Sequence, residues 1–160
     1  MQMLISTKGR YALRVMIELA QSQSEKPVPL WQIAEKQEIS EKYLEAILKT
    51  LGQAGLVRGT RGKGGGYLLA CDPDACTAGQ ILRAAEDTIA TVACAALSGG
   101  HCARADGCLT LPFWRTLQQK IEDFLDSVTL SQLAAPEWAD PIGLPGGAVQ
   151  PETTPPICPQ

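Results

Sequence analysis

The fold is decided by residues 40–70, SEKYLEAILKTLGQAGLVRGTRGKGGGYLLA. Ser40 is a good helix N-cap, the apolar residues after it recur at the helical period, and Gly55 stands where the helix should end. Two short extended runs, LVRGTRG and GYLLA, then flank a glycine-rich turn, which predicts a β-hairpin. A capped helix followed directly by a hairpin is typical of the recognition helix and wing of a winged-helix domain.

The residues before this stretch complete the predicted domain. Residues 7–21, TKGRYALRVMIELAQ, place apolar side chains on one helical face and Arg10 and Arg14 on another. After the proline-marked turn KPVPL, residues 30–37, LWQIAEKQ, predict a second, shorter helix. A short helix, a tight turn and a capped second helix form a helix-turn-helix. The expected fold class is therefore mainly α with a small β-hairpin wing.

Eight residues of this domain are predicted to lie near DNA: Ser40, Lys42, Tyr43, Glu45, Lys49, Arg58, Arg61 and Lys63. Cations on a narrow hairpin can reach phosphate groups or the minor groove, and polar side chains on a recognition helix can reach the major groove. Glu45 differs from the others because a carboxylate repels phosphate unless it accepts from a cytosine amino group, so it is a candidate for selectivity. The alternative is that Lys42, Glu45 and Lys49 form an ordinary solvated helix face.

Charge is divided unevenly along the 160-residue chain, although its net charge is only −3. Residues 1–70 hold ten Lys or Arg and six Glu, a net charge of +4, whereas residues 71–160 hold four basic and eleven acidic residues, a net charge of −7. A basic half is suited to a polyanion such as double-stranded DNA. Because no apolar stretch approaches the length of a bilayer span, we expect no membrane partner.

The acidic half predicts two further helices. Thr77 is placed to cap a helix over AGQILRAAED, and residues 110–128, TLPFWRTLQQKIEDFLDSV, predict a long helix with an apolar seam from Leu111 to Val128. A seam of this length needs a partner helix. We expect a second copy of the chain, which gives a homodimer; the alternative is packing within the chain against the helix at 7–21.

Three regions are therefore expected. Residues 1–75 form the winged helix-turn-helix domain, residues 76–135 hold a cysteine loop and the dimerisation helix, and residues 136–160 form a disordered tail with seven prolines. An enzyme is not expected, because the chain has one histidine and no nucleophile constellation or paired carboxylates. The glycine-rich turn also lacks the Gly-Lys-Ser/Thr pattern of a phosphate-binding loop.

Three cysteines lie in a short glycine-rich loop, C-AALSGGH-C-ARADG-C, at Cys94, Cys102 and Cys108. Thiolates are soft donors that suit an iron-sulfur cluster or zinc, although the C-x2-C spacing usual for zinc is absent. Disulfides are disfavoured, because MQMLISTKGR has no apolar secretory core and we expect a reducing, cytoplasmic location. Redox-active thiols and unrelated free thiols remain as alternatives. Cys71 and Cys76 flank a turn outside this motif and are interpreted as small structural residues.

The chain resembles the family of winged-helix regulators typified by the iron-sulfur cluster assembly regulator IscR, with the nitric-oxide sensor NsrR and the cysteine-metabolism regulator CymR as relatives. The resemblance covers residues 1–135 and is carried by STKGRYAL, PVPLWQIAEKQEIS, GLVRGTRGKGGGYLLA, the three cysteines, FWRTL and LDSVTLSQL. It implies sequence-specific transcriptional control, with the family's cluster-ligand positions on Cys94, Cys102 and Cys108.

The fourth cluster ligand does not carry over from the family. The position of the histidine ligand in IscR is Leu111 here, and the place of the carboxylate ligand in NsrR is near Arg10; neither side chain ligates iron. The remaining candidates are His101, Glu86 or Asp87, Asp106, Cys158, a small thiol and an open iron site. The cluster is therefore left open between the 2Fe–2S and 4Fe–4S types.

Two functions follow from these patterns. The main hypothesis is a homodimeric regulator, acting as a repressor on a palindromic operator, that senses iron-sulfur or redox status through the three-cysteine cluster. The alternative is a cluster-free regulator that is controlled by protein-protein interaction or by thiol redox state.

Overall fold

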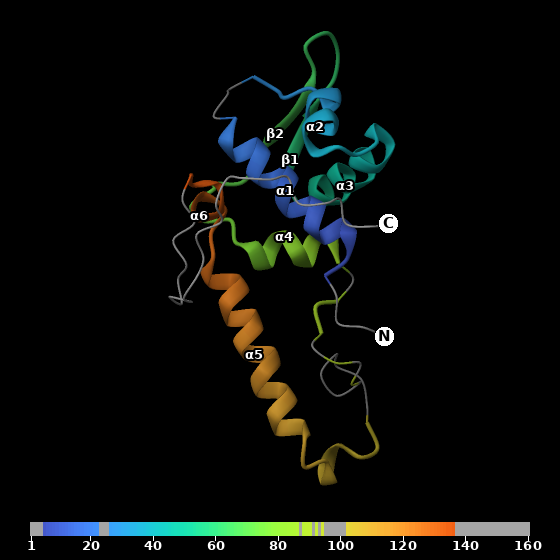
Figure 1. Cartoon of the computed structure of the whole chain (residues 1–160), viewed down its shortest axis with the longest axis vertical. Coiled ribbons are helices and arrows are strands. Elements are labelled where there is room, and N and C mark those ends of the chain that lie inside the picture. Colours follow the sequence, from blue (N-terminus) through green and yellow to red (C-terminus); the bar gives the residue numbers. More distant parts are fainter. Residues whose placement is uncertain are drawn as a thin grey trace, which may run out of the picture.

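The computed structural model describes residues 5–22, 26–86, 88–90, 92, 94 and 102–136. His101, Asp87, Cys158 and most of the proline-rich tail lie outside the described residues. In chain order the elements are α1 (Thr7–Gln21), α2 (Leu30–Gln37), α3 (Glu41–Gln53), β1 (Val57–Thr60), β2 (Gly66–Leu69), α4 (Ala78–Ala85), the short 3₁₀ helix η1 (Ala105–Gly107), α5 (Leu111–Ser127) and α6 (Leu130–Ala134). Figure 1 shows α1–α3, the hairpin and α4 gathered at one end, with α5 extending away from them.

Local capping explains where the helices begin and end. The Ser40 hydroxyl accepts from the backbone N–H of Tyr43 at 3.3 Å, which confirms the predicted start of α3. Thr77 and Gln80 form a reciprocal capping box at the start of α4, as predicted for Thr77. Gly55 follows α3 with a φ of 74°, a left-handed conformation that favours glycine and ends the helix.

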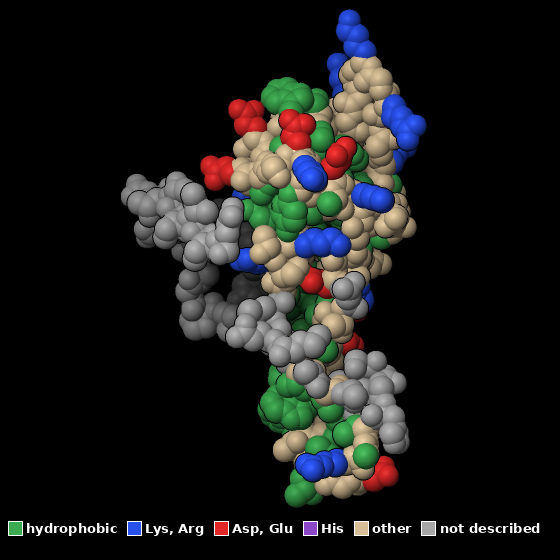
Figure 2. Space-filling view, turned by 90° about the vertical axis from the view of Figure 1, so that its right-hand side faces the viewer, with side chains coloured by type: hydrophobic (Ala, Val, Ile, Leu, Met, Phe, Trp, Pro, Cys, Tyr) green, Lys and Arg blue, Asp and Glu red, His purple; other side chains and the backbone are tan. Residues whose placement is uncertain are grey.

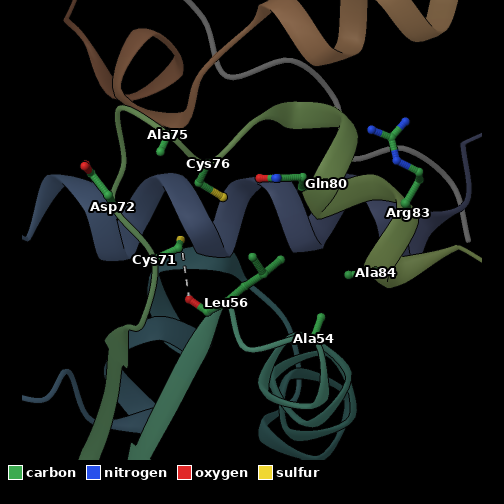
Figure 3. A pocket seen from close by; sticks show the side chains of 9 residues that line it. All are labelled: Ala54, Leu56, Cys71, Asp72, Ala75, Cys76, Gln80, Arg83 and Ala84. Carbon is green, nitrogen blue, oxygen red and sulfur yellow. Dashed lines mark hydrogen bonds between the residues drawn. The ribbon is translucent and has the colours of Figure 1, made fainter.

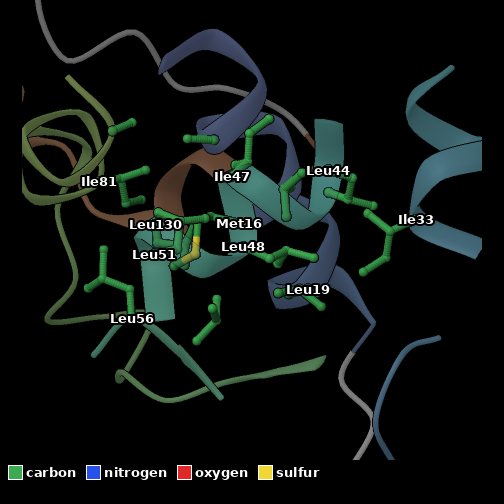
Figure 4. Close-up of a cluster of buried hydrophobic side chains, with 14 of the residues drawn as sticks. Met16, Leu19, Ile33, Leu44, Ile47, Leu48, Leu51, Leu56, Ile81 and Leu130 are labelled. Atoms are coloured by element: carbon green, nitrogen blue, oxygen red, sulfur yellow. The ribbon is translucent and has the colours of Figure 1, made fainter. Parts of the chain in front are cut away.

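The hydrophobic core lies between α1 and α3 and is closed by α4 and α6. Figure 4 shows Met16 of α1 beside Leu51 of α3 and Leu130 of α6, all of them fully buried. Ile81 of α4 belongs to the same cluster. Residues before and after the predicted boundary at residue 75 share this core, so α4 and α6 help to hold the winged-helix elements in place. The division of the chain into three regions stays a prediction.

The hairpin is tied to the chain that precedes α2. β1 and β2 pair antiparallel, with Arg58 opposite Leu68 and Thr60 opposite Gly66. Tyr67 of β2 also exchanges two backbone hydrogen bonds with Val28, at 2.8 and 2.9 Å, so that a single residue extends the sheet beyond β2. A Cβ built on Gly66 would overlap the carbonyl oxygen of Val28, which explains why glycine is needed at this position.

Gly66→Ala is expected to lower the free energy of unfolding by about 1–3 kcal/mol, because the added methyl must displace backbone rather than a flexible side chain. Urea unfolding followed by circular dichroism measures this loss. Gly59→Ala, in the paired strand, is the matched control: its Cβ would lie 3.4 Å from the Tyr67 ring, an ordinary contact. We expect the control to change the free energy by less than about 1 kcal/mol. Equal effects of the two substitutions would contradict the close approach at Val28.

Helix α5 packs on α4 near its C-terminal end and then leaves the body of the protein (Figure 1). Arg83 of α4 forms an ion pair with Asp126 of α5. In the predicted seam Leu111 and Val128 are buried and Phe124 is 37% exposed, while the other members are half-buried: Trp114, Leu117, Ile121 and Leu125. Phe113, which lies outside the predicted seam, is 61% exposed. The helix that the sequence offered as an internal partner, α1, packs instead on α4 and on α6, a short helix that the sequence did not predict. Phe113 and Phe124 therefore leave part of the apolar surface of α5 exposed within the described chain.

Candidate nucleic-acid interface and cysteine loop

The turn between α2 and α3 sets the orientation of the predicted recognition helix. Glu38 ends α2 in a left-handed conformation, with a φ of 55°, and its N–H donates to the carbonyl of Glu35 at 3.1 Å. The next N–H, of Ile39, donates to the carbonyl of Ala34 at 3.1 Å. Buried Ile33 of α2 belongs to the same core cluster as residues of α3. This tight connection holds α2 and α3 as a helix-turn-helix.

The outer face of α3 carries the predicted DNA-facing side chains. Lys42, Glu45 and Lys49 are all exposed, while the Ser40 hydroxyl is engaged as the helix cap. Tyr43 is half-buried, with its ring edge-to-face against Tyr11 of α1 at a centroid distance of 6.0 Å. Burial raises the pKa of Tyr43, so its phenol is protonated at neutral pH and can donate a hydrogen bond.

The wing adds three exposed cations to this surface, Arg58 on β1 and Arg61 and Lys63 at the hairpin tip. Figure 2 shows Lys and Arg side chains on the hairpin end of the molecule and on the body beside it. In the described part of the chain, Lys36 is paired with Glu18 and Arg83 with Asp126, and no ion pair involves the lysines of α3 or the cations of the wing. The two α3 lysines and the three wing cations therefore keep their charges available for an external anion.

Three supporting residues were missed by the sequence analysis. The Arg14 guanidinium lies over the Tyr11 ring at 5.1 Å, and its Nε donates to the Gln37 side-chain oxygen at 2.7 Å. Gln37 is buried on the inner side of α2. These contacts hold Tyr11 against Tyr43 of the recognition helix. The sequence could have pointed to Gln37, because it is a polar residue on the face of α2 whose other residues are apolar.

The structure does not bring the three loop cysteines together. Cys94, Cys102 and Cys108 are free and half-buried, and no group of three metal-ligating side chains occurs among the described residues. A hydrogen bond with the Thr110 hydroxyl, at 3.4 Å between Sγ and Oγ1, lowers the pKa of Cys108. A thiol with a lowered pKa supplies more of the thiolate that iron requires, so the donor chemistry fits a cluster.

Glu86, one of the candidate fourth ligands, is engaged elsewhere. One of its carboxylate oxygens accepts from both the backbone N–H of Ser6, at 2.8 Å, and the Ser6 hydroxyl, at 2.7 Å. Ser6 is itself the N-cap of α1. A Cβ on Gly9 would overlap this carboxylate, so the first turn of α1 and the end of α4 are in close contact. Asp106 is exposed on η1, and Leu111 is buried at the start of α5.

The helix-turn-helix, its wing and the cations on them define a winged-helix DNA-binding protein. The Rrf2 family profile, described as an iron-dependent transcriptional regulator, matches residues 5–136, and the chain belongs to this family. It is 40% identical over 131 residues to the HTH-type transcriptional regulator IscR of Erwinia tasmaniensis, covering 82% of this chain and 78% of that protein.

Solved structures agree with this assignment. CymR (YrzC), the global cysteine regulator of B. subtilis, has a TM-score of 0.68 and 40% sequence identity, over 81% of this chain and 94% of that one. T. potens IscR has a TM-score of 0.63 and 38% identity, over 80% of this chain and 83% of that one. The resemblance found in the sequence is confirmed, and the protein is a transcriptional regulator of the Rrf2 family. None of the described helices is long and apolar enough to cross a bilayer.

Proposed function

We propose that the protein binds palindromic operators as a homodimer in the cytoplasm and represses transcription. The observation that carries this proposal is the set of five exposed cations on α3 and the wing without a carboxylate partner in the described chain. In this proposal α3 enters the major groove with Lys42, Tyr43, Glu45 and Lys49 near the bases, and Ser40 lies at its N-terminus. Arg58, Arg61 and Lys63 contact the phosphate backbone and the minor groove.

We also propose that Cys94, Cys102 and Cys108 hold an iron-sulfur cluster of the 2Fe–2S or 4Fe–4S type. Support comes from the three free thiols on one loop, the thiolate-favouring contact at Cys108 and the IscR-named relatives. When bound, a cluster supplies a centre that is sensitive to oxidants and to iron supply. Glu86 is held by Ser6 and Leu111 is apolar, so the candidates for the fourth ligand are His101, Asp87, Asp106, Cys158, a small thiol and an open iron site.

A second function is favoured by the likeness to CymR, named a global cysteine regulator. In this alternative the chain carries no cluster and responds to a bound protein or to the redox state of its thiols. The visible spectrum of protein purified without air separates the two. Absorption that bleaches in air supports the cluster, whereas a colourless protein with full DNA affinity supports the alternative.

The DNA-binding proposal is tested by selecting duplexes from a random pool with anaerobic full-length protein. We expect an enriched palindrome and an affinity that falls steeply with salt concentration, as expected for a protein that neutralises several phosphates. Absence of any enriched duplex, or an affinity that does not change with salt, would contradict the proposed interface.

Arg61→Ala is expected to weaken binding to every duplex and to reduce the salt dependence by about one phosphate contact. The reason is that Arg61 is an exposed cation at the tip of the hairpin. Fluorescence anisotropy at several salt concentrations measures the slope. Lys120→Ala removes the same charge from exposed α5 and serves as the control, with no change in slope. If Arg61→Ala behaved like the control, the hairpin would not be a DNA-contacting wing.

Glu45→Ala is expected to relax selectivity among related duplexes by about 1–3 kcal/mol while leaving affinity for the preferred operator within about tenfold. The exposed Glu45 carboxylate should reject sites at which it meets no cytosine amino group. Competition binding with single-base variants of the operator measures this difference. A uniform loss at every site would contradict the selectivity role and would indicate a general loss of α3 placement.

A further inference from the structure

Cys71 and Cys76 face each other at the junction between the wing and α4. Cys71 follows β2, Cys76 precedes α4, and the backbone N–H of Cys76 donates to the carbonyl of Asp72 at 2.8 Å, which folds the segment between them into a tight turn. The two thiols lie close enough for each to shift the pKa of the other. Figure 3 shows both sulfur atoms in the same pocket, with Cys71 half-buried and Cys76 buried.

The pocket gives a small molecule access to this pair. Its volume is about 550 Å³, and it is open to solvent at the surface between α3 and α4. Ala54, Leu56 and Ala84 supply apolar lining, while Gln80 and Asp72 supply polar groups. Arg83 at its edge is paired with Asp126. A mixed, weakly charged lining of this kind is suited to a small organic molecule rather than to a strongly charged one.

The two thiols differ in their acidity. The neighbouring Cys76 thiol lowers the pKa of Cys71 to about 7, so a large share of Cys71 is thiolate at neutral pH. The neighbouring Cys71 sulfur, together with burial, raises the pKa of Cys76, which keeps its proton. A half-exposed thiolate beside a protonated thiol is the arrangement of an attacking and a resolving cysteine.

We propose that Cys71 and Cys76 form a reactive dithiol that small organic disulfides convert to an intramolecular disulfide, separately from the three loop cysteines. The Cys71 thiolate attacks one sulfur of the organic disulfide, forming a mixed disulfide and releasing one thiolate. The Cys76 sulfur, as its proton passes to solvent or to that thiolate, then attacks Cys71 and releases the second organic thiol. The organic disulfide is reduced to two thiols and the protein dithiol is oxidised, so atoms and electrons balance.

The Cys71–Cys76 disulfide would also alter the base of the wing. Its effect on DNA binding rests on the proposed DNA-binding function. The protonated Cys71 thiol donates to the carbonyl of Leu56 at 3.7 Å, and the N–H of Ala70 donates to the same oxygen at 2.9 Å. Leu56 connects α3 to β1. Disulfide formation draws Cys71 toward Cys76 and removes its donor from Leu56, at the point where the recognition helix and the wing meet.

The test treats the native full-length chain with hydroxyethyl disulfide at neutral pH and then alkylates the remaining thiols in denaturant. We expect peptide mass spectrometry to find a Cys71–Cys76 bond that dithiothreitol reverses. Cys76→Ala protein should instead accumulate the mixed disulfide on Cys71, and Cys71→Ala protein should give neither product at these positions. Full alkylation of both native thiols after treatment, or a mixed disulfide that persists on Cys71 in the native chain, would overturn the proposal.

Operator affinity provides the second measurement, made on cluster-free protein so that only thiol chemistry differs. Formation of the bond should weaken operator binding by about fivefold or more, reversibly, and Cys71→Ala should remove this response. A bond that forms without changing affinity would overturn the effect on the wing. If the reduced protein bound no DNA, the proposed DNA-binding function would be contradicted instead. The mass measurement would still show whether Cys71 and Cys76 form a disulfide.

Discussion

Cys102→Ser protein purified without air should show no visible absorption and no bound sulfide, whereas the native protein should be coloured. A hydroxyl is a much poorer iron ligand than a thiolate, and the loop offers only three cysteines, so losing one removes a third of its soft donors. The same result is expected for Cys94→Ser and Cys108→Ser. All three variants should remain dimeric, because the α5 seam lies outside the cysteine loop. Iron and sulfide analysis with size-exclusion chromatography measures both properties.

Cys71→Ser is the matched control, since it removes a cysteine that lies outside the loop. It should keep nearly all of the absorption, and truncation after residue 135 should do the same unless Cys158 supplies a ligand. Full iron content in Cys102→Ser protein would remove the basis of the cluster proposal. So would native protein, prepared without air, in which zinc alone occupies the loop.

The double substitution Phe113→Asp and Phe124→Asp should convert the protein to a monomer and lower operator affinity by about a hundredfold or more. Both rings lie on the exposed apolar side of α5, at 61% and 37% exposure, and an exposed apolar surface of this kind marks an interface. Two carboxylates there would be desolvated beside apolar neighbours in a dimer. A monomer also loses the gain from binding two half-sites at once. Sedimentation and anisotropy measurements test the two effects.

Gln119→Asp adds a carboxylate on the opposite, solvent-facing side of α5, where Gln119 is exposed. This control should stay dimeric and bind the operator with native affinity. If the Phe113→Asp and Phe124→Asp protein were still a folded dimer, the exposed apolar side of α5 would not be the interface. Circular dichroism of the double variant separates loss of dimerisation from loss of folding, because α5 contributes little to the buried core.

The sequence predicted those parts of the fold that depend on neighbouring residues. The cap at Ser40, the stop at Gly55 and the glycine turn of the hairpin are local signals, and the structure confirms all three. Contacts between distant segments were not predictable in this way. The pairing of Tyr67 with Val28 and the packing of α5 on α4 depend on tertiary geometry that periodicity does not encode.

The candidate site shows the same division. Exposure of the cations on α3 and the wing follows from helical and strand periodicity, so residue types and spacing were enough to predict their placement. Cys71 and Cys76 were interpreted as structural residues because nothing local distinguishes a thiol pair from two separate cysteines. Only the fold shows that their sulfur atoms share one pocket. The loop cysteines were recognised from spacing, and their ligand role stays a prediction.

The contact between Glu86 and Ser6 joins two parts of the chain that are far apart in sequence. Glu86 directly follows α4 on the side of the cysteine loop, and Ser6 caps the helix whose Tyr11 packs on Tyr43 of α3. Under the proposed function, a displacement of the loop would act on the first turn of α1 and, one turn later, on Tyr11 beside α3. Such a change would then reach the proposed DNA surface through contacts within one chain, without passing through α5.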